Sequence, residues 1–336
     1  MVRTRPHVVT LGTAGGPRWW RSNPVRAGIA TAVVVGDAWY LVDAGTGVGR
    51  QITQADLPFE QLRGIFVTHM HSDHTVDLLS LLLFGVYELE NRADTPVHII
   101  GPGDRGALPP TSSLAATPPR PVAPHLPTPG ITDMVRLLVE SHAADVNDRV
   151  LDSLRASPAD LFAPRDIALP GDIGYHSNEN PTPGMAPFVV HADDRVRVTA
   201  TLVLHPPVAP AFAFRFDTDE GSVTISGDTA PCDNLVRLAA DTDLLLHEAI
   251  DLALIDRNYV GVTDPIKLAS QEHLHKSHTD IQDTARIARD ACARALALHH
   301  LVPGVGSAEQ WRPGEQGYTG RILVPDDLDV IEFGRG

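Results

Sequence analysis

The sequence has little cysteine and a shortage of positive charge. Cys232 and Cys292 are the only cysteines in its 336 residues, so no disulfide framework is indicated and a reducing cytoplasm fits the composition. The 27 lysine and arginine residues are outnumbered by 42 aspartate and glutamate residues, which gives a formal net charge of -15. This balance disfavours a broad electrostatic surface for nucleic acid or for an anionic membrane.

Long apolar runs are missing as well. No stretch approaches the roughly 18 to 20 consecutive apolar residues that a membrane span requires. Residues 1–6 lack the apolar core of a secretory signal, so we expect a cytoplasmic protein with no membrane segment. A hydrophobic content of 43% and a charged fraction of 21% are typical of a globular chain, and the length allows one large domain with an insertion or two smaller domains.

Potential metal ligands, in contrast, are dense at one place. His69, His71, Asp73 and His74 lie within six residues, directly after a predicted strand over residues 64–67. Packing does not explain four such side chains at this density. Imidazole and carboxylate ligands suit zinc, and they also accept iron or manganese. We therefore expect a metal site here, with its remaining ligands elsewhere in the chain.

Strand and helix patterns follow one another in each half of the sequence. Short runs rich in β-branched residues predict strands, and apolar residues at three-and-four spacing predict helices. The predicted strands are residues 7–11, 29–35, 39–42, 64–67, 97–100, 196–204, 211–216, 222–226, 244–246 and 295–298. The predicted helices are residues 48–55, 73–83, 131–154, 234–239 and 280–293. Elements of this kind favour a two-sheet core with helices outside.

The stretch 101–190 differs in composition from the rest. Its many prolines favour extended and loop conformations over a packed sheet, and one long helix is predicted over residues 131–154. We interpret 101–190 as an insertion within a single catalytic domain, residues 1–336, because the strand pattern resumes after it. The insertion would serve as a lid, a pocket wall or a dimer contact, and its apolar helix would suit a homodimer.

Further candidate ligands come directly after predicted strands. They are His205, Asp228, His247, His299 and His300. Loops at the ends of strands can converge on one pocket, so these side chains make a dinuclear metal site a strong hypothesis.

A glycine-rich turn, residues 12–17, follows the first predicted strand. The lysine and the Ser/Thr of a phosphate-binding loop are missing from it, so we interpret it as a tight strand exit near the site. Arg18, Arg21 and Arg26 come next, and one of them could hold an anionic group of the substrate.

The order and spacing of these residues resemble the metallo-β-lactamase fold superfamily. The resemblance covers nearly the whole chain outside the insertion, and it rests on His69-X-His71-X-Asp73-His74, His205, Gly227-Asp228-Thr229 and a terminal histidine. It implies an α/β fold, a four-layer αββα sandwich, here with a proline-rich and partly helical insertion.

Two further segments resemble one branch of that superfamily. Leu246-His247-Glu248-Ala249 and Ser277-His278-Thr279 are similar to paired loops of the ribonuclease Z-like group. This group includes the tRNA 3′-processing enzymes, type III arylsulfatases and related small-molecule hydrolases.

The resemblance implies a division of the ligands between two metal ions. His69, His71 and His205 would hold one ion, Asp73, His74 and His300 would hold the second, and Asp228 would bridge them. His299 is the competing candidate for the place of His300. The expected ions are two Zn2+, and Mn2+ or Fe2+ would suit the same ligands. Two divalent ions about 3.5 to 4 Å apart can share one hydroxide and can stabilise the oxygens of a displacement transition state.

The leaving group of such a reaction requires a proton. We expect His278 to be the general acid, because an imidazole with a pKa near neutrality can donate and recover a proton. Glu248 or His247 would orient it, and Asp43 would anchor a ligand or its loop. Asp73 would bind metal and also orient the hydroxide, so the predicted catalytic residues are Asp73 and His278.

The insertion and the net charge both bear on the substrate. The insertion has few basic residues and the chain is acidic, so we expect a small-molecule ester substrate, with an arylsulfatase-like enzyme as the leading hypothesis, and we do not expect nucleic acid. A lactone, a carboxylic ester or a small phosphodiester would use the same hydroxide. Two further hypotheses for the function are a ribonuclease Z-type tRNA 3′ endonuclease and a metal-binding protein without hydrolytic activity.

Overall fold

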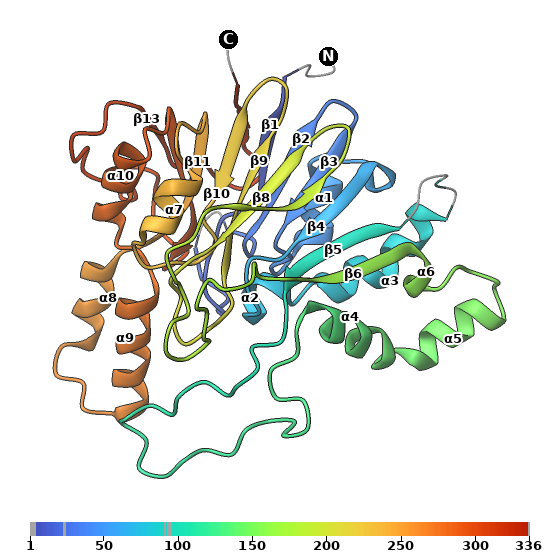
Figure 1. Ribbon diagram of the computed structural model, residues 1–336, viewed down its shortest axis with the longest axis horizontal. Helices are drawn as coiled ribbons and strands as arrows, with labels where there is room; N and C mark the ends of the chain where they lie inside the picture. Colours follow the sequence, from blue (N-terminus) through green and yellow to red (C-terminus); the bar gives the residue numbers. More distant parts are fainter. Residues whose placement is uncertain (1–4, 23–24, 91, 93–95, 335–336) are drawn as a thin grey trace.

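Two sheets of seven strands face each other in the computed structural model, which describes residues 5–22, 25–90, 92 and 96–334 (Figure 1). The strand order is β14-β1-β2-β3-β4-β5-β6 in the first sheet and β13-β12-β11-β10-β9-β8-β7 in the second. The first sheet contains β1 (His7–Gly12), β2 (Ala30–Val35), β3 (Ala38–Val42), β4 (Leu62–Phe66), β5 (Val97–Pro102), β6 (Phe162–Ile167) and β14 (Val330–Glu332). The second contains β7 (Phe188–Ala192), β8 (Arg197–Leu202), β9 (Phe212–Asp217), β10 (Ser222–Ile225), β11 (Leu244–Ile250), β12 (Ala295–Val302) and β13 (Arg321–Leu323).

Helices cover the outer faces of the two sheets. Near the first sheet lie α1 (Val48–Gln54), α2 (Ser72–Thr75), α3 (Leu78–Leu89), α4 (Ile131–Glu140), α5 (Ala143–Leu151), α6 (Pro158–Leu161) and the 3-10 helix η1 (Phe59–Gln61). Near the second lie α7 (Asp233–Leu238), α8 (Leu252–Tyr259), α9 (Pro265–Ser277) and α10 (Ile281–Asp290). None of the helices in these described ranges combines the length and the apolar run that crossing a membrane requires.

The space between the sheets is filled by apolar side chains. Phe66 from β4 lies against Phe216 and Phe214 from β9, with ring centroids 5.1 Å and 5.5 Å apart. All three side chains are fully buried. Two other apolar clusters lie outside the sheets, one beneath α1, α3 and α4 and one beneath α7 and α10. Because each sheet is covered on both faces, central strands such as β3 and β11 are largely apolar and fully buried. The predicted four-layer αββα fold is confirmed.

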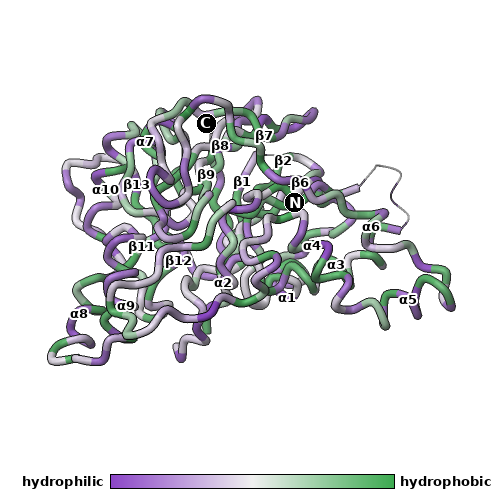
Figure 2. Tube along the Cα trace, turned by 60° about the horizontal axis from the view of Figure 1, so that its bottom comes forward, coloured by the Kyte–Doolittle hydropathy of each residue, from purple (hydrophilic) through white to green (hydrophobic). Residues whose placement is uncertain are grey.

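The directions of the strands determine where loops converge. In the first sheet β3 to β6 run parallel, and in the second β10 to β13 run parallel. The carboxyl ends of parallel strands lie at one edge of a sheet, which is where open α/β sheets bind ligands. At this edge α2 lies between the α8–α9 hairpin and α1, as Figures 1 and 2 show.

The predicted helix over residues 131–154 is wrong as a single element. The chain forms α4 and α5 instead, separated at Ser141 and His142. The Ser141 hydroxyl donates to the carbonyl of Leu138 at 2.6 Å, and His142 leaves the helical region with φ -114°. A serine hydroxyl that bonds to the backbone competes with helix propagation, which explains the break.

Strand β6 lies inside the stretch 101–190, where the composition favoured loops, and β7 begins within it at Phe188. β6 pairs in parallel with β5, and β7 pairs with β8 in antiparallel. Each is the last strand of its sheet, and β6 contains Pro164. An edge strand tolerates proline because one of its sides has no hydrogen-bonding partner strand. The helices α8 and α9, and the short strands β13 and β14, are further elements that the sequence patterns do not predict.

The aromatic contacts between the sheets predict a large effect of truncating Phe66. Phe66→Ala is expected to lower the free energy of unfolding by about 3 to 5 kcal/mol, because it leaves a cavity between the two sheets. Guanidinium denaturation followed by circular dichroism measures this change. Phe84→Ala is the matched control, since Phe84 on α3 is 63% exposed and its loss should cost less than about 0.5 kcal/mol. Equal losses for the two variants would contradict the prediction.

Candidate metal centre

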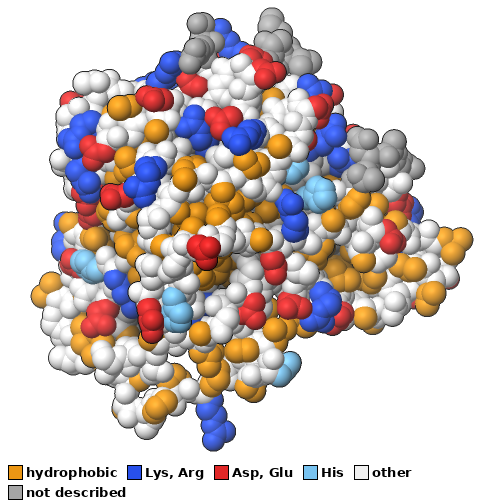
Figure 3. Space-filling view, viewed as in Figure 1, with side chains coloured by type: hydrophobic (Ala, Val, Ile, Leu, Met, Phe, Trp, Pro, Cys, Tyr) orange, Lys and Arg blue, Asp and Glu red, His pale blue; other side chains and the backbone are white. Residues whose placement is uncertain are grey.

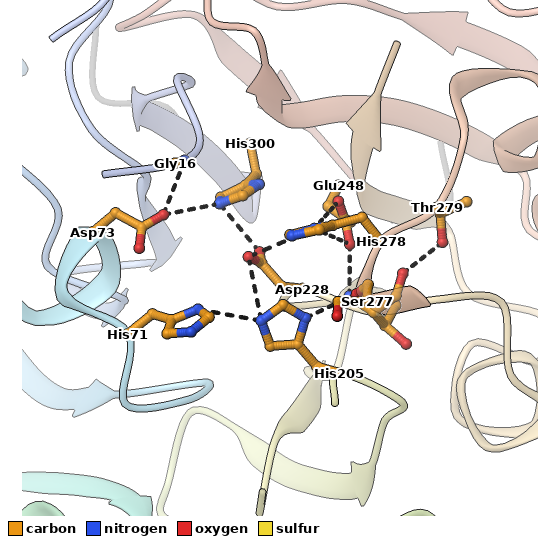
Figure 4. A network of polar contacts seen from close by, with 12 residues as sticks. Gly16, His71, Asp73, His205, Asp228, Glu248, Ser277, His278, Thr279 and His300 are labelled. Atoms are coloured by element: carbon orange, nitrogen blue, oxygen red, sulfur yellow. Dashed lines mark hydrogen bonds and ion pairs between the residues drawn. The ribbon is translucent and has the colours of Figure 1, made fainter. Parts of the chain in front are cut away.

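The side chains predicted to bind metal lie together at the edge where the strands end (Figure 4). They come from both halves of the chain. His69 and His71 follow β4, Asp73 and His74 are on α2, His205 follows β8, Asp228 follows β10, and His300 lies within β12. Apart from half-buried His71, all of them are buried.

A first cluster consists of His69, His71, His205 and Asp228. Nδ1 of His71 lies 3.0 Å from Nε2 of His69 and 3.2 Å from Nε2 of His205. Oδ2 of Asp228 lies 3.8 Å and 4.0 Å from the same two Nε2 atoms. Ligand atoms bound to one tetrahedral zinc ion at 2.0 to 2.1 Å are separated by about 3.4 Å, so these donors fit one ion.

A second cluster consists of Asp73, His74, Asp228 and His300. Nε2 of His300 lies 3.2 Å from Nε2 of His74, 3.2 Å from Oδ1 of Asp228 and 3.3 Å from Oδ2 of Asp73. Oδ1 of Asp228 is buried and has no hydrogen-bond partner within the described residues. A buried oxygen of this kind requires an explanation, and a cation between it and the imidazoles provides one. The two oxygens of Asp228 therefore face the two clusters separately.

The protonation states of His69, His205 and Asp228 suit metal binding. Burial holds the pKa of His69 and of His205 well below the usual range, so each ring is neutral and has a free lone pair. Burial alone would raise the pKa of Asp228. The attraction of His300 and His74 outweighs burial and holds this pKa well below its usual range, so the carboxylate is ionised.

Asp43 orients the histidine-rich segment, as the sequence suggests. Its Oδ2 lies 2.8 Å from Nδ1 of His74, and its Oδ1 accepts from the backbone N–H of Thr68 at 2.8 Å. Asp43 is 2% exposed. A bond to Nδ1 fixes the ring so that Nε2 of His74 faces the second cluster.

His300 reaches the site through an irregularity in β12. The predicted strand ends at Leu298, but β12 continues to Val302 and contains His299 and His300, so the prediction that these histidines follow the strand is wrong. His299 pairs with Glu248, and the register then shifts at His300, whose φ is +50°. This β-bulge re-aims the His300 side chain. The same error applies to His247, which lies within β11.

The bulge also distinguishes the two neighbouring histidines. His299 points away from both clusters, and its Nδ1 lies 3.4 Å from the Thr31 hydroxyl. Burial, followed by the neighbouring His300, lowers the pKa of His299 to about 3. Gly15 packs against the ring of His300 so closely that a Cβ there would lie 2.3 Å from Nδ1. Only glycine fits at this position of the turn predicted to lie near the site.

His278 and Glu248 form a buried pair beside the clusters. Nδ1 of His278 lies 3.0 Å and 3.1 Å from the two oxygens of Glu248, and 3.9 Å from Oδ2 of Asp228. Burial lowers the pKa of His278, but the Glu248 carboxylate and Asp228 raise it more, to about 9. Of the two residues considered as partners of His278, Glu248 makes the contact. His247 instead bonds through Nδ1 to the Glu248 carbonyl at 2.7 Å.

The sequence reasoning missed the contribution of α9. His273 on this helix lies near His205 and His278, with ring centroids 5.9 Å and 5.8 Å away. Asp264 caps the helix and Pro265 occupies its first turn, which together are a start signal that could have revealed it.

A cavity of about 580 Å³ opens onto the two clusters. The α8–α9 hairpin forms one of its walls, with Ile255, Tyr259 and Lys267, and the loop after β1 forms another, with Arg18 and Trp20. The arrangement thus offers two cation positions, a protonated imidazole and a partly apolar pocket. Such a site can hydrolyse an ester.

Known proteins resemble this chain in sequence and in fold. A family model described as Anti-Pycsar protein Apyc1 matches residues 31–100, which include the histidine-rich segment. Ribonuclease Z of Mycobacterium bovis (strain BCG / Pasteur 1173P2) is 28% identical over 327 residues, which are 96% of this chain and 97% of that protein.

Two solved structures share the fold over nearly the full length. The short form of human tRNase Z (ELAC1) has a TM-score of 0.60 and 19% identity, and the match covers 98% of this chain and 100% of that one. The metallo-beta-lactamase fold protein YhfI from Bacillus subtilis has a TM-score of 0.60 and 18% identity, covering 98% and 99%. Sequence, fold and donor clusters agree: this chain has the metallo-β-lactamase fold, and over nearly its whole length it is similar to ribonuclease Z.

Proposed function

We propose that this protein is a ribonuclease Z-type phosphodiesterase that hydrolyses RNA with two bound divalent ions. The position of Asp228 carries the proposal, because one of its oxygens faces each donor cluster. The relatives named ribonuclease Z and tRNase Z support RNA as the substrate class, and the ribonuclease Z matches nearly the whole length of this chain. The small-molecule ester expected from the composition is therefore the second choice.

We assign the ligands as the two clusters divide them. His69, His71 and His205 would hold one ion, and Asp73, His74 and His300 the other, with Asp228 shared. Zinc fits these nitrogen and carboxylate donors, and when bound it would supply Lewis acidity and a water of depressed pKa. A shared carboxylate between the ions would reduce their mutual repulsion.

His278 is proposed to protonate the leaving group. Glu248 accepts a hydrogen bond from Nδ1–H of His278. The Nε2–H of the protonated ring is therefore free to donate to a group in the cavity. The negative charge of Glu248 stabilises the imidazolium before it gives up that proton. Asp73 would orient the attacking water, since its Oδ2 is held in place by the backbone N–H of Gly16 at 2.9 Å.

A small-molecule ester hydrolase, with an aryl sulfate as the first substrate to test, is the second candidate. The formal charge of -15 favours it. On the face shown in Figure 3, lysine and arginine side chains are scattered among aspartate and glutamate side chains. A pocket of about 580 Å³ also suits a compact ligand. The same acid and the same metal ligands would serve a sulfate ester, a lactone or a small phosphodiester.

A precursor tRNA with a 3′ trailer tests the proposal directly. The zinc-loaded protein at low salt is expected to remove the trailer, and an excess of EDTA is expected to stop the reaction. Gel electrophoresis of the labelled RNA follows it. Aryl sulfate, lactone and bis(4-nitrophenyl) phosphate are assayed beside the RNA. Turnover of aryl sulfate or lactone with the RNA left intact would overturn the proposal in favour of the second candidate.

Asp228→Asn tests the shared carboxylate. The variant is expected to retain about one metal equivalent or less where the wild type holds about two, because the amide carries no charge to offset two cations. Plasma mass spectrometry of the purified proteins measures the content. Asp256→Asn is the matched control, since Asp256 on α8 is part of an exposed pair with His275 at 2.7 Å. Two equivalents bound to Asp228→Asn would refute the assignment.

His278→Gln and Glu248→Gln test the proposed acid and its partner. His278→Gln is expected to lower kcat by about 10²- to 10⁴-fold, as the loss of a general acid does. Glu248→Gln is expected to lower it by about 10- to 100-fold, because it acts through His278. Metal content, measured in parallel, should stay at the wild-type value. Loss of metal from His278→Gln would instead identify His278 as a ligand.

A further inference from the structure

The loop of residues 15–20 separates two cavities at the candidate metal centre. The hairpin cavity, about 580 Å³, lies between this loop and the α8–α9 hairpin, and the α1 cavity, about 990 Å³, lies between the loop and α1. Gly16, Arg18, Trp20 and Asp73 line both cavities. The second ligand cluster, which contains Asp73, is therefore at the boundary between them. Figure 2 shows the same order of elements, with α2 between the hairpin and α1.

The loop is held firmly against the site. The backbone N–H of Gly16 donates to Oδ2 of Asp73 at 2.9 Å, and the indole N–H of Trp20 donates to the carbonyl of Gly15 at 2.7 Å. A Cβ at Gly304 would lie 2.5 Å from the Trp20 ring, so the ring packs directly on the backbone there. A ligand that contacts this loop thus has a defined position relative to the metal ligands.

Two consecutive tryptophans of the loop line the α1 cavity, and Trp20 also lines the hairpin cavity. Trp20 is half-buried, packs with Ile255 and Val302, and lines both cavities. Trp19 is 91% exposed and lines the α1 cavity. Val25, 74% exposed, lines the α1 cavity beside it. Trp19 and Val25 thus present apolar surface to solvent at the α1 cavity.

Basic side chains line the same two cavities. Arg18 lies over the Trp20 ring at 5.9 Å and lines both cavities, Lys267 lines the hairpin cavity, and Arg50 lines the α1 cavity. All three are exposed, and none forms an ion pair within residues 5–22, 25–90, 92 and 96–334. Arg26, in contrast, is occupied by Asp326 at 2.6 Å. Arg18, Arg50 and Lys267 thus supply positive charge beside the carboxylates of Asp73 and Asp228, in a chain whose formal net charge is -15.

We propose that a single-stranded nucleotide segment crosses the loop, with its bases on the two sides of the scissile phosphate stacked on Trp20 and on Trp19. Arg18, Arg50 and Lys267 contact the flanking phosphates. This inference rests on the proposed function and specifies the part of the RNA that the site recognises. Proteins bind single-stranded nucleic acid by stacking its bases on aromatic side chains beside a positively charged groove. Paired bases in a duplex have their faces covered, so a duplex does not fit.

Equilibrium binding tests the proposal without depending on turnover. The zinc-loaded His278→Gln protein is titrated into a fluorescein-labelled single-stranded hexaribonucleotide, and anisotropy gives Kd. Adding Trp19→Ala is expected to weaken binding roughly fivefold or more, and Trp19→Phe is expected to restore most of it. Arg50→Ala should reduce the salt dependence of Kd by about 0.7 in log-log slope. Phe84→Ala, which removes an exposed aromatic side chain that lines neither cavity, should leave Kd unchanged.

The outcomes separate this inference from the proposed function. If the wild type removes the tRNA trailer but Trp19→Ala binds the hexaribonucleotide as tightly as its parent, the inference is overturned and the function stands. If the trailer is not removed but binding depends on Trp19, the function fails and the inference stands. No measurable binding, or displacement of the hexaribonucleotide by an equal concentration of duplex RNA, also overturns the inference.

Discussion

The site depends on one buried carboxylate, that of Asp228. It is 2% exposed and lies at the edge where the strands end, and a buried charge without a partner is costly. Imidazoles from both halves of the chain surround it, with Nε2 of His300 at 3.2 Å and Nε2 of His74 at 3.3 Å from its Oδ1. His278 approaches the other oxygen at 3.9 Å. The loops at this edge of the two sheets are thus positioned around a single charge.

Much of the fold can be predicted from the sequence because its signals are local. Strands buried on both faces appear as short apolar runs, so β4, β9 and β12 are recognised directly. The segment from His69 to His74 is recognised because its residue types are too dense for packing alone. The pair of Glu248 and His278 requires the family resemblance, because thirty positions of sequence separate its members.

The errors of the prediction share a non-local cause. The bulge at His300 is a matter of register with β11, and nothing in residues 295–302 marks it. Edge strand β6 is stabilised by pairing with β5 in spite of Pro164. Helix α9 exposes most of its residues, so it lacks a clear apolar stripe, and its importance comes from His273 facing His205. Contacts of this kind exist only after the chain has folded.

The division of the donors between the halves of the chain has a consequence for how the molecule forms. His69, His71, Asp73 and His74 belong to the first sheet and its helices, whereas His205, Asp228 and His300 belong to the second. Neither cluster is complete until the sheets have closed on each other around Phe66 and its neighbours. Affinity for a divalent ion is therefore coupled to the docking of the two halves. A cation bound by both sets of donors would hold the two halves together and would resist the separation of the sheets.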